Sequence, residues 1–96
     1  NGALAQTIAQ TPQAIGYVSI GYITGEVKAV PVIAGTSPDA VAPAAEAIRS
    51  GVYPLHRELF VFTNGEPQGL AKDFIDFMKS GAGQKIAEEE GFVAVN

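Results

Sequence analysis

The chain has 96 residues, of which 47% are hydrophobic and 17% charged, so it makes one small domain with a single core at most. Six basic and ten acidic side chains give a net charge of −4, and the basic ones are scattered, which argues against nucleic acid as a partner. The absence of cysteine excludes a disulfide framework, a thiolate zinc site and a cysteine nucleophile. No apolar run approaches the roughly 18–20 residues of a membrane span.

The first half of the chain predicts two helices and two strands. A short helix is expected over residues 1–10, because Leu and Ile side chains fall on one face. Residues 14–23 are rich in Val, Ile and Tyr and predict a strand, and residues 27–33 predict a second, edge strand. After a loop, a helix is expected over residues 43–50, with Gly51 just past its end.

The second half adds a strand, two helices and a final strand. The first strand is expected over residues 55–63, and it leads through a turn into a helix that residues 80–83 break. That helix carries an apolar stripe that we expect to lie in the core: Leu70, Phe74, Phe77 and Met78. A last helix is expected over residues 84–90 with Gly91 as its C-cap, followed by a strand over residues 92–95. The order α-β-β-α-β-α-α-β predicts a mixed α/β fold.

No arrangement of side chains indicates catalysis or a metal site. His56, the only histidine, has no neighbouring Ser or Asp pattern and is expected at a strand entry rather than as a general base. The carboxylates of residues 88–90 point about 100° apart on a helix and do not converge on an ion. Residues 81–83 favour a helix–helix turn over an anion site. Tyr17 and Tyr22 are expected to pack with their hydroxyls at a rim. We therefore assign no catalytic residue, no metal ligand and no cofactor.

Several strings, in order along the whole chain, carry a family resemblance. They are NGA at residues 1–3, TPQAIGYVSIGY at 11–22, AIRSGVYPLHRELF at 47–60, FIDF at 74–77, GQKI at 83–86 and EEGFV at 89–93. Together they resemble the C-terminal part of the phosphate-binding proteins of ABC phosphate importers. The strings around AIGYVS and YPLHRELF are the more specific ones, and the GQKI-like tail is shared more widely among periplasmic solute-binding proteins.

The resemblance implies a type II periplasmic-binding-protein fold, in which two α/β lobes enclose a ligand cleft. Residues 1–52 would be the closing part of the second lobe. Residues 53–63 would form the hinge and the return crossing strand, and residues 64–96 would be C-terminal helices packing on the first lobe. The hinge candidates are Tyr53, Pro54 and Leu55, where the proline ring restricts the crossing strand.

The resemblance also implies a function for the whole protein, namely capture of inorganic phosphate outside the cytoplasm for the membrane subunits of an ABC importer. In the family that the chain resembles, the phosphate ligands come largely from an early Gly-Ser/Thr-rich loop, an acidic residue of the first lobe and a second motif of the Gly-Ser-Gly-Thr kind. These lie upstream of this segment, and no Gly-Ser-Gly-Thr occurs here. We therefore transfer no phosphate ligand, and Asn1 and Gly2 are peripheral at best. The chain opens without an initiating Met or a basic leader, so we expect it to be a segment of something longer.

Two alternatives stay open at this stage. Low charge and unpaired strand edges favour a self-associating module, in the simplest case a homodimer or a strand-exchanged form with rearranged packing. A binding protein for another oxyanion or small solute is the second alternative, because a fold does not fix its ligand. An enzyme is the least expected class.

Overall fold

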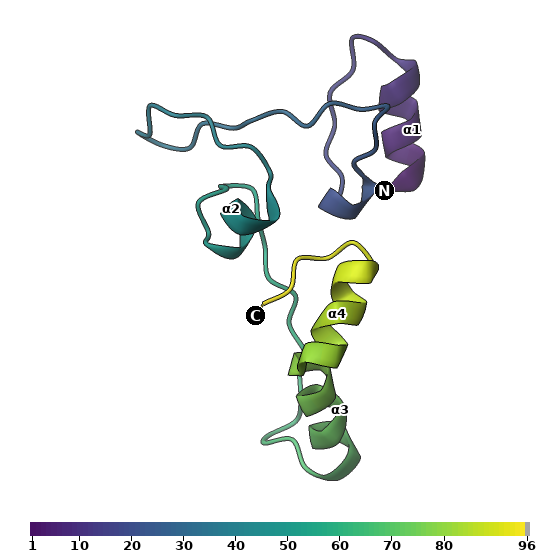
Figure 1. Cartoon of the computed structure of the whole chain (residues 1–96), viewed down its shortest axis with the longest axis vertical. Coiled ribbons are helices and arrows are strands. Elements are labelled where there is room, and N and C mark those ends of the chain that lie inside the picture. Colours follow the sequence, from purple (N-terminus) through teal and green to yellow (C-terminus); the bar gives the residue numbers. More distant parts are fainter. Residues whose placement is uncertain (96) are drawn as a thin grey trace.

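The structure is a computed structural model, and it describes residues 1–95. Its elements are four α-helices and one 3₁₀ turn (Figure 1): α1 Gly2–Gln10, η1 Ile20–Tyr22, α2 Ala45–Arg49, α3 Gly69–Lys79 and α4 Gly81–Glu89. Within residues 1–95 the one β pairing is an antiparallel bridge between Val32 and Val41, whose amides and carbonyls exchange two hydrogen bonds of 2.9 Å. No helix in this range is both long and apolar enough to cross a membrane.

The predicted helices all form, because their signals are local in sequence. Gly51 and Gly91 follow α2 and α4 with φ values of +77° and +85°, a conformation that glycine adopts without strain. At the end of α4, the Gly91 amide donates to the Glu88 carbonyl and the Phe92 amide to the Ala87 carbonyl, both at 3.0 Å. This pair of bonds is a Schellman motif, so the predicted C-cap at Gly91 is confirmed.

The predicted break between the last two helices is shorter than expected. Residues 81–83 belong to α4, and Ser80 alone separates the two helices. The Ser80 hydroxyl donates to the Phe77 carbonyl at 2.6 Å and accepts from the Gly83 amide at 3.2 Å. One serine therefore closes α3 and caps α4, which is why a run of small residues can remain helical here.

The predicted strands do not form as paired strands, which corrects the predicted order of elements. Residues 20–22 of the first one make the turn η1, and residues 55–63 and 92–95 carry no strand assignment. The second predicted strand pairs only at Val32. A strand needs hydrogen-bonded neighbours on its edges, and this chain does not bring two of these segments side by side over any length. The mixed α/β class therefore stays an expectation from the family.

The expected core also does not form, because the chain is too open to cover its apolar side chains. Phe74 and Phe77 of α3 are 64% and 48% exposed, and Leu70 is exposed as well, so placing the α3 stripe in the core was wrong for this chain. Ala94 is the one buried hydrophobic residue within residues 1–95. The radius of gyration is 16.6 Å, against about 12 Å for a compact chain of this length.

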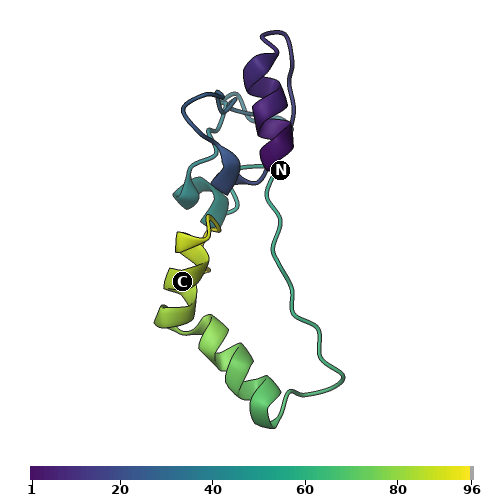
Figure 2. The same cartoon turned by 90° about the vertical axis from the view of Figure 1, so that its right-hand side faces the viewer.

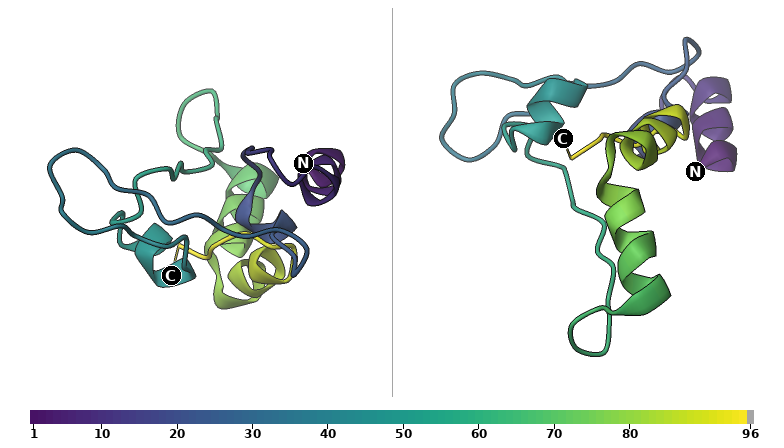
Figure 3. Two further views of the ribbon diagram at one scale, coloured as in Figure 1. Left: turned by 90° about the horizontal axis from the view of Figure 1, so that it is seen from above. Right: turned by 60° about the horizontal axis from the view of Figure 1, so that its bottom comes forward.

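The figures show the same openness. The segment between α2 and α3 runs as an extended tube apart from α3 and α4 (Figure 2), and the loop that the Val32–Val41 bridge closes projects away from the helices (Figure 3). Among the described helices, α3 and α4 make the most contacts with each other, at the bend where the end of one meets the start of the next (Figures 1 and 2). The junction at Ser80 therefore holds the C-terminal third together.

Gly83 is the residue at this junction that has no room for a side chain. A Cβ atom built on it would lie 2.2 Å from the Phe77 carbonyl oxygen, whereas one built on Gly81 would meet nothing within 4 Å. We expect Gly83→Ala to lower the stability of the α3–α4 pair by about 1–3 kcal/mol. The matched control Gly81→Ala should be neutral or stabilise the helix by about 0.5–1 kcal/mol. Urea unfolding followed by far-ultraviolet circular dichroism measures both, and equal midpoints for the two variants would contradict the packing described.

Candidate functional site

Arg49, the last residue of α2, joins three parts of the chain. Its Nε donates to the Ala94 carbonyl at 3.0 Å, and its guanidinium lies 3.7 Å from the Glu88 carboxylate of α4 and 3.4 Å from Glu46 one turn back. The Arg49 side chain is only 35% exposed. These contacts attach α2 to α4 and to the C-terminal tail, and they surround the buried Ala94.

Gln84 fixes the same tail from the other side. Its amide nitrogen donates to the Met78 carbonyl at the end of α3, and its amide oxygen accepts from the Val95 amide, both at 2.7 Å. One side chain therefore satisfies an orphan carbonyl of a helix end and a backbone amide of the tail. Gln84, the glutamine of the GQKI string, therefore holds the C-terminal tail against the end of α3.

Two glycines let the N-terminal part of the chain reach the end of α4. A Cβ atom on Gly21, in η1, would lie 2.8 Å from the Gly91 oxygen, and one on Gly91 would lie 2.8 Å from the Gly21 Cα. Only glycine at both positions allows the two backbones to come this close.

The segment that leaves α2 bends at the predicted hinge. The Tyr53 amide donates to the Ala47 carbonyl of α2 at 2.9 Å, and the Tyr53 carbonyl accepts from Nδ1–H of the His56 ring. Tyr53 and Pro54 are half-buried, and Leu55 is 69% exposed. The backbone is thus held at Tyr53, and residues 55–62 of the described chain make no backbone–backbone hydrogen bond.

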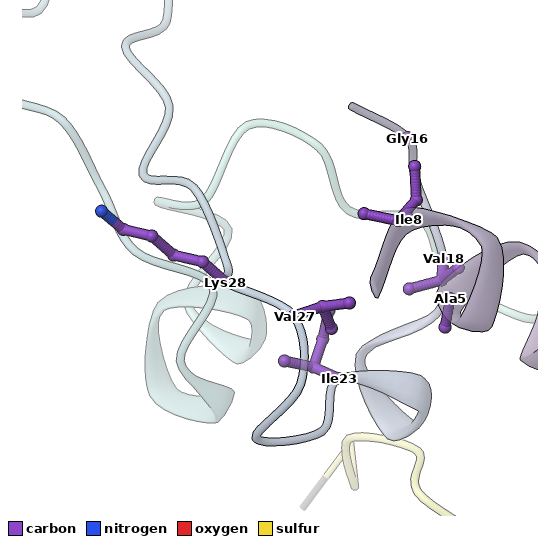
Figure 4. Close-up of a pocket in the computed structure, with 7 residues that line it drawn as sticks. All are labelled: Ala5, Ile8, Gly16, Val18, Ile23, Val27 and Lys28. Carbon is purple, nitrogen blue, oxygen red and sulfur yellow. The ribbon is translucent and has the colours of Figure 1, made fainter. Parts of the chain in front are cut away.

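Two open hollows lie beside α1. The smaller one has a volume of about 50 Å³ and is lined mainly by aliphatic side chains (Figure 4), among them Ile8, Val18 and Ile23, while Lys28 points away from the others. The larger one, of about 240 Å³, is lined by Gly2 and by six further residues, of which Glu26 alone is charged. The larger hollow has no basic lining residue, and Lys28 of the smaller one points away from its other lining residues, so neither hollow brings a positive charge to its centre.

The other predicted residues lie apart from one another. Asn1 is exposed and makes no side-chain cap bond to α1. His56 is exposed beside the bend, and the strand that it was expected to enter does not form. Tyr17 is 88% exposed and not packed, which corrects that expectation, whereas the Tyr22 ring lies against Gly2.

The acidic run near the C-terminus does not form a metal site. Glu88 pairs with Arg49, and Glu89 lies 4.0 Å from the Lys85 ammonium one turn earlier in α4. Among residues 1–95 no group of three or more His, Cys, Asp or Glu side chains could hold a metal ion.

Sequence reasoning missed the two side chains that hold the tail. Arg49 and Gln84 lie within the AIRSG and GQKI strings, but the sequence predicts no role for either side chain. Both contacts join segments far apart in sequence, Arg49 to Ala94 and Gln84 to Val95, and no periodicity reports such a contact. The resemblance strings were the one available signal.

Comparison with known proteins assigns the family. The profile of the "PBP superfamily domain" matches residues 2–82. The chain therefore belongs to the PBP superfamily, and the resemblance found in the sequence strings is confirmed.

Individual relatives cover nearly all of the chain. It is similar to the "Phosphate-binding protein PstS" of Bacillus subtilis, with 35% identity over 99% of this chain and 30% of the relative. The protein of the same name from Borreliella burgdorferi is 34% identical over 99% of this chain and 34% of the relative. "Phosphate-binding protein PstS 2" of Streptococcus agalactiae is 31% identical over 94% of this chain and 29% of the relative.

The chain thus spans about a third of the length of the curated relatives that it matches. No solved structure matches it significantly.

The Arg49 contacts predict the effect of removing the guanidinium. Arg49→Ala leaves the Ala94 carbonyl and the Glu88 carboxylate without their partner, so we expect a loss of about 1–2 kcal/mol and faster amide exchange at Val95. Arg57→Ala removes the same charge from an exposed position and serves as the control. Hydrogen exchange measured by mass spectrometry tests this, and the same exchange rate at the tail in both variants would contradict it.

Proposed function

We propose that this chain is the C-terminal part of an extracytoplasmic solute-binding protein that captures inorganic phosphate for an ABC importer. The observation that carries the proposal is the similarity of nearly the whole chain to proteins named for phosphate binding in several bacteria. The matching strings occur in the family's order from residue 1 to residue 93. The chain matches only about a third of each relative, which supports a segment rather than a complete binding protein.

The phosphate ligands would lie outside this segment. Within residues 1–95 the larger hollow has Glu26 as its charged lining residue, and the half-buried Arg49 is already used by Glu88 and Ala94. Capture of phosphate in a binding protein needs several converging amides and hydroxyls, typically at helix N-termini. Asn1 and Gly2, at the N-terminus of α1, are the residues of this segment nearest in sequence to the upstream ligand motifs, and they would be peripheral to the bound phosphate.

The chain would contribute lobe packing and a hinge. Residues 1–52 would complete the second lobe, residues 53–63 would cross back, and residues 64–96 would pack on the first lobe. Two features support this division: α1 and the segments beside it share a small apolar cluster, and α3 packs on α4. Tyr53, Pro54 and Leu55 would form the hinge, with the Tyr53 amide anchored on α2.

The partners follow from the same proposal. Inorganic phosphate would bind to residues of the longer protein that lie upstream of this segment. The membrane subunits of the importer would then receive the phosphate. The names of the relatives describe binding and no reaction, which supports a binding protein rather than an enzyme.

Calorimetry with inorganic phosphate tests the proposal. The chain joined to its natural upstream sequence should bind phosphate with micromolar or tighter affinity, that is, about −8 kcal/mol or better. The 96 residues alone should give no measurable heat of binding, because they lack the ligand motifs. Sulfate is the control oxyanion. Tight binding by the 96 residues alone, or a preference of the longer protein for sulfate, would contradict the proposal.

The hinge has its own prediction in the longer protein. Pro54→Gly releases the backbone restraint at the crossing, so the open form gains conformational entropy that closure must remove. We expect phosphate to bind about two- to fivefold more weakly. Pro67→Gly, in the turn before α3, makes the same change outside the hinge and should leave the affinity unchanged. Equal affinities for the two variants would place the hinge elsewhere.

A further inference from the structure

One peptide group near the C-terminus is held from two sides. The Ala94 carbonyl accepts from Nε of Arg49, the last residue of α2, at 3.0 Å. The Val95 amide donates to the Gln84 side chain of α4 at 2.7 Å. This carbonyl and this amide belong to the same peptide group, which is planar and rigid. A single rigid group, next to the buried Ala94, therefore connects α2 with α4.

A second contact makes the same connection at the other end of the tail, residues 91–95. Gly21 in η1 and Gly91 after α4 approach so closely that a Cβ atom on Gly21 would lie 2.8 Å from the Gly91 carbonyl oxygen. Glu88, in the last turn of α4, adds an ion pair of 3.7 Å with Arg49. Figures 1 and 3 both show the end of the tail close to α2. The tail is thus attached at both of its ends to residues that precede the bend after α2.

These contacts join parts that the proposed function assigns to different lobes. Residues 1–52 would complete the second lobe and residues 64–96 would pack on the first, so the bond from Arg49 to the tail would cross from one lobe to the other. The covalent crossing is held more weakly, because residues 55–62 make no backbone–backbone hydrogen bond within the described chain. The lobes would therefore have two links, a loose covalent one and a hydrogen-bonded one.

The hydrogen-bonded link lies at the base of the hinge. Arg49 ends α2 just before Tyr53, whose amide donates to the Ala47 carbonyl of the same helix. A contact close to a hinge moves little when the lobes rotate, so it persists in the open and the closed form. Such a contact limits the other orientations that the open lobes can adopt. A restrained open form loses less conformational freedom on closure, and it binds its ligand more tightly for that reason.

We propose that the tail is a strap across the hinge, and that Arg49 is a positioning residue whose bonds to the tail keep the lobes aligned for closure on phosphate. The proposal rests on the function proposed above. It goes further because it names a side chain outside the ligand site on which the phosphate affinity depends.

Two variants of the longer protein cut the strap at separate points. Arg49→Ala removes the bonds to the tail, and Gly21→Ala places a methyl group where the Gly91 backbone lies. Each should weaken phosphate binding in calorimetry by about three- to tenfold, because the open lobes gain orientations that closure must remove. The matched controls are Lys85→Ala, which removes an exposed charge from α4, and Gly25→Ala, whose methyl group meets nothing within 4 Å. Both controls should bind like the unchanged protein, and unchanged or tighter binding by the two strap variants would overturn the proposal.

Small-angle X-ray scattering separates this positioning role from a loss of folding. Without phosphate, the two strap variants should have a larger radius of gyration than the unchanged longer protein. With saturating phosphate the radii should become equal, because the ligand holds the closed form. Equal radii without phosphate, or a larger radius that persists with saturating phosphate, would overturn the proposal. The scattering without phosphate needs no ligand, so a failure of the unchanged protein to bind phosphate would contradict the proposed function and leave this test of the strap intact.

Discussion

A shortage of buried apolar surface is the constraint on which the rest of this structure depends. Nearly half of the residues are hydrophobic, and yet Ala94 is the one buried hydrophobic residue that the described part of the chain contains. Folding stability comes mainly from removing apolar surface from water, so a chain that buries so little relies on other contacts. Apolar side chains of α3 and of residues 59–62 are exposed to solvent. The PstS relatives, which are about three times as long as this chain, are consistent with that shortage.

Polar contacts, rather than apolar packing, connect the distant segments of this chain. Arg49 links α2 to the Ala94 carbonyl, Gln84 links α3 to Val95, and Ser80 joins two helices through its hydroxyl. Each hydrogen bond contributes only about 1 kcal/mol to stability, so this network fixes the geometry of the tail more than it supplies folding free energy. The extended segment after Tyr53 lies outside this network. That difference between a fixed base and an unsupported strand is what makes the bend a hinge candidate.

The helices could be predicted from the sequence, whereas the strands and the contact residues could not. Helix signals such as Gly51, Gly91 and the stripe of α3 are local, and all of them are found where expected. Residues 55–63 have a strand pattern, but a strand exists only with a neighbour, and the pattern does not say whether that neighbour belongs to the same chain. For the same reason the α3 stripe was assigned to a core that this chain does not build. The family was recognised because its strings preserve particular residues at particular positions, which propensity and periodicity ignore.

The unpaired backbone and exposed side chains of residues 59–62 connect the family assignment with the open structure. Amide hydrogen exchange at these four residues, measured in the 96-residue chain and in the longer protein proposed above, tests the account most directly. The account predicts slower exchange in the longer protein, because each amide pairs only when a neighbouring strand is present. Equally fast exchange in both, with the amides of α3 and α4 protected as usual, would contradict it.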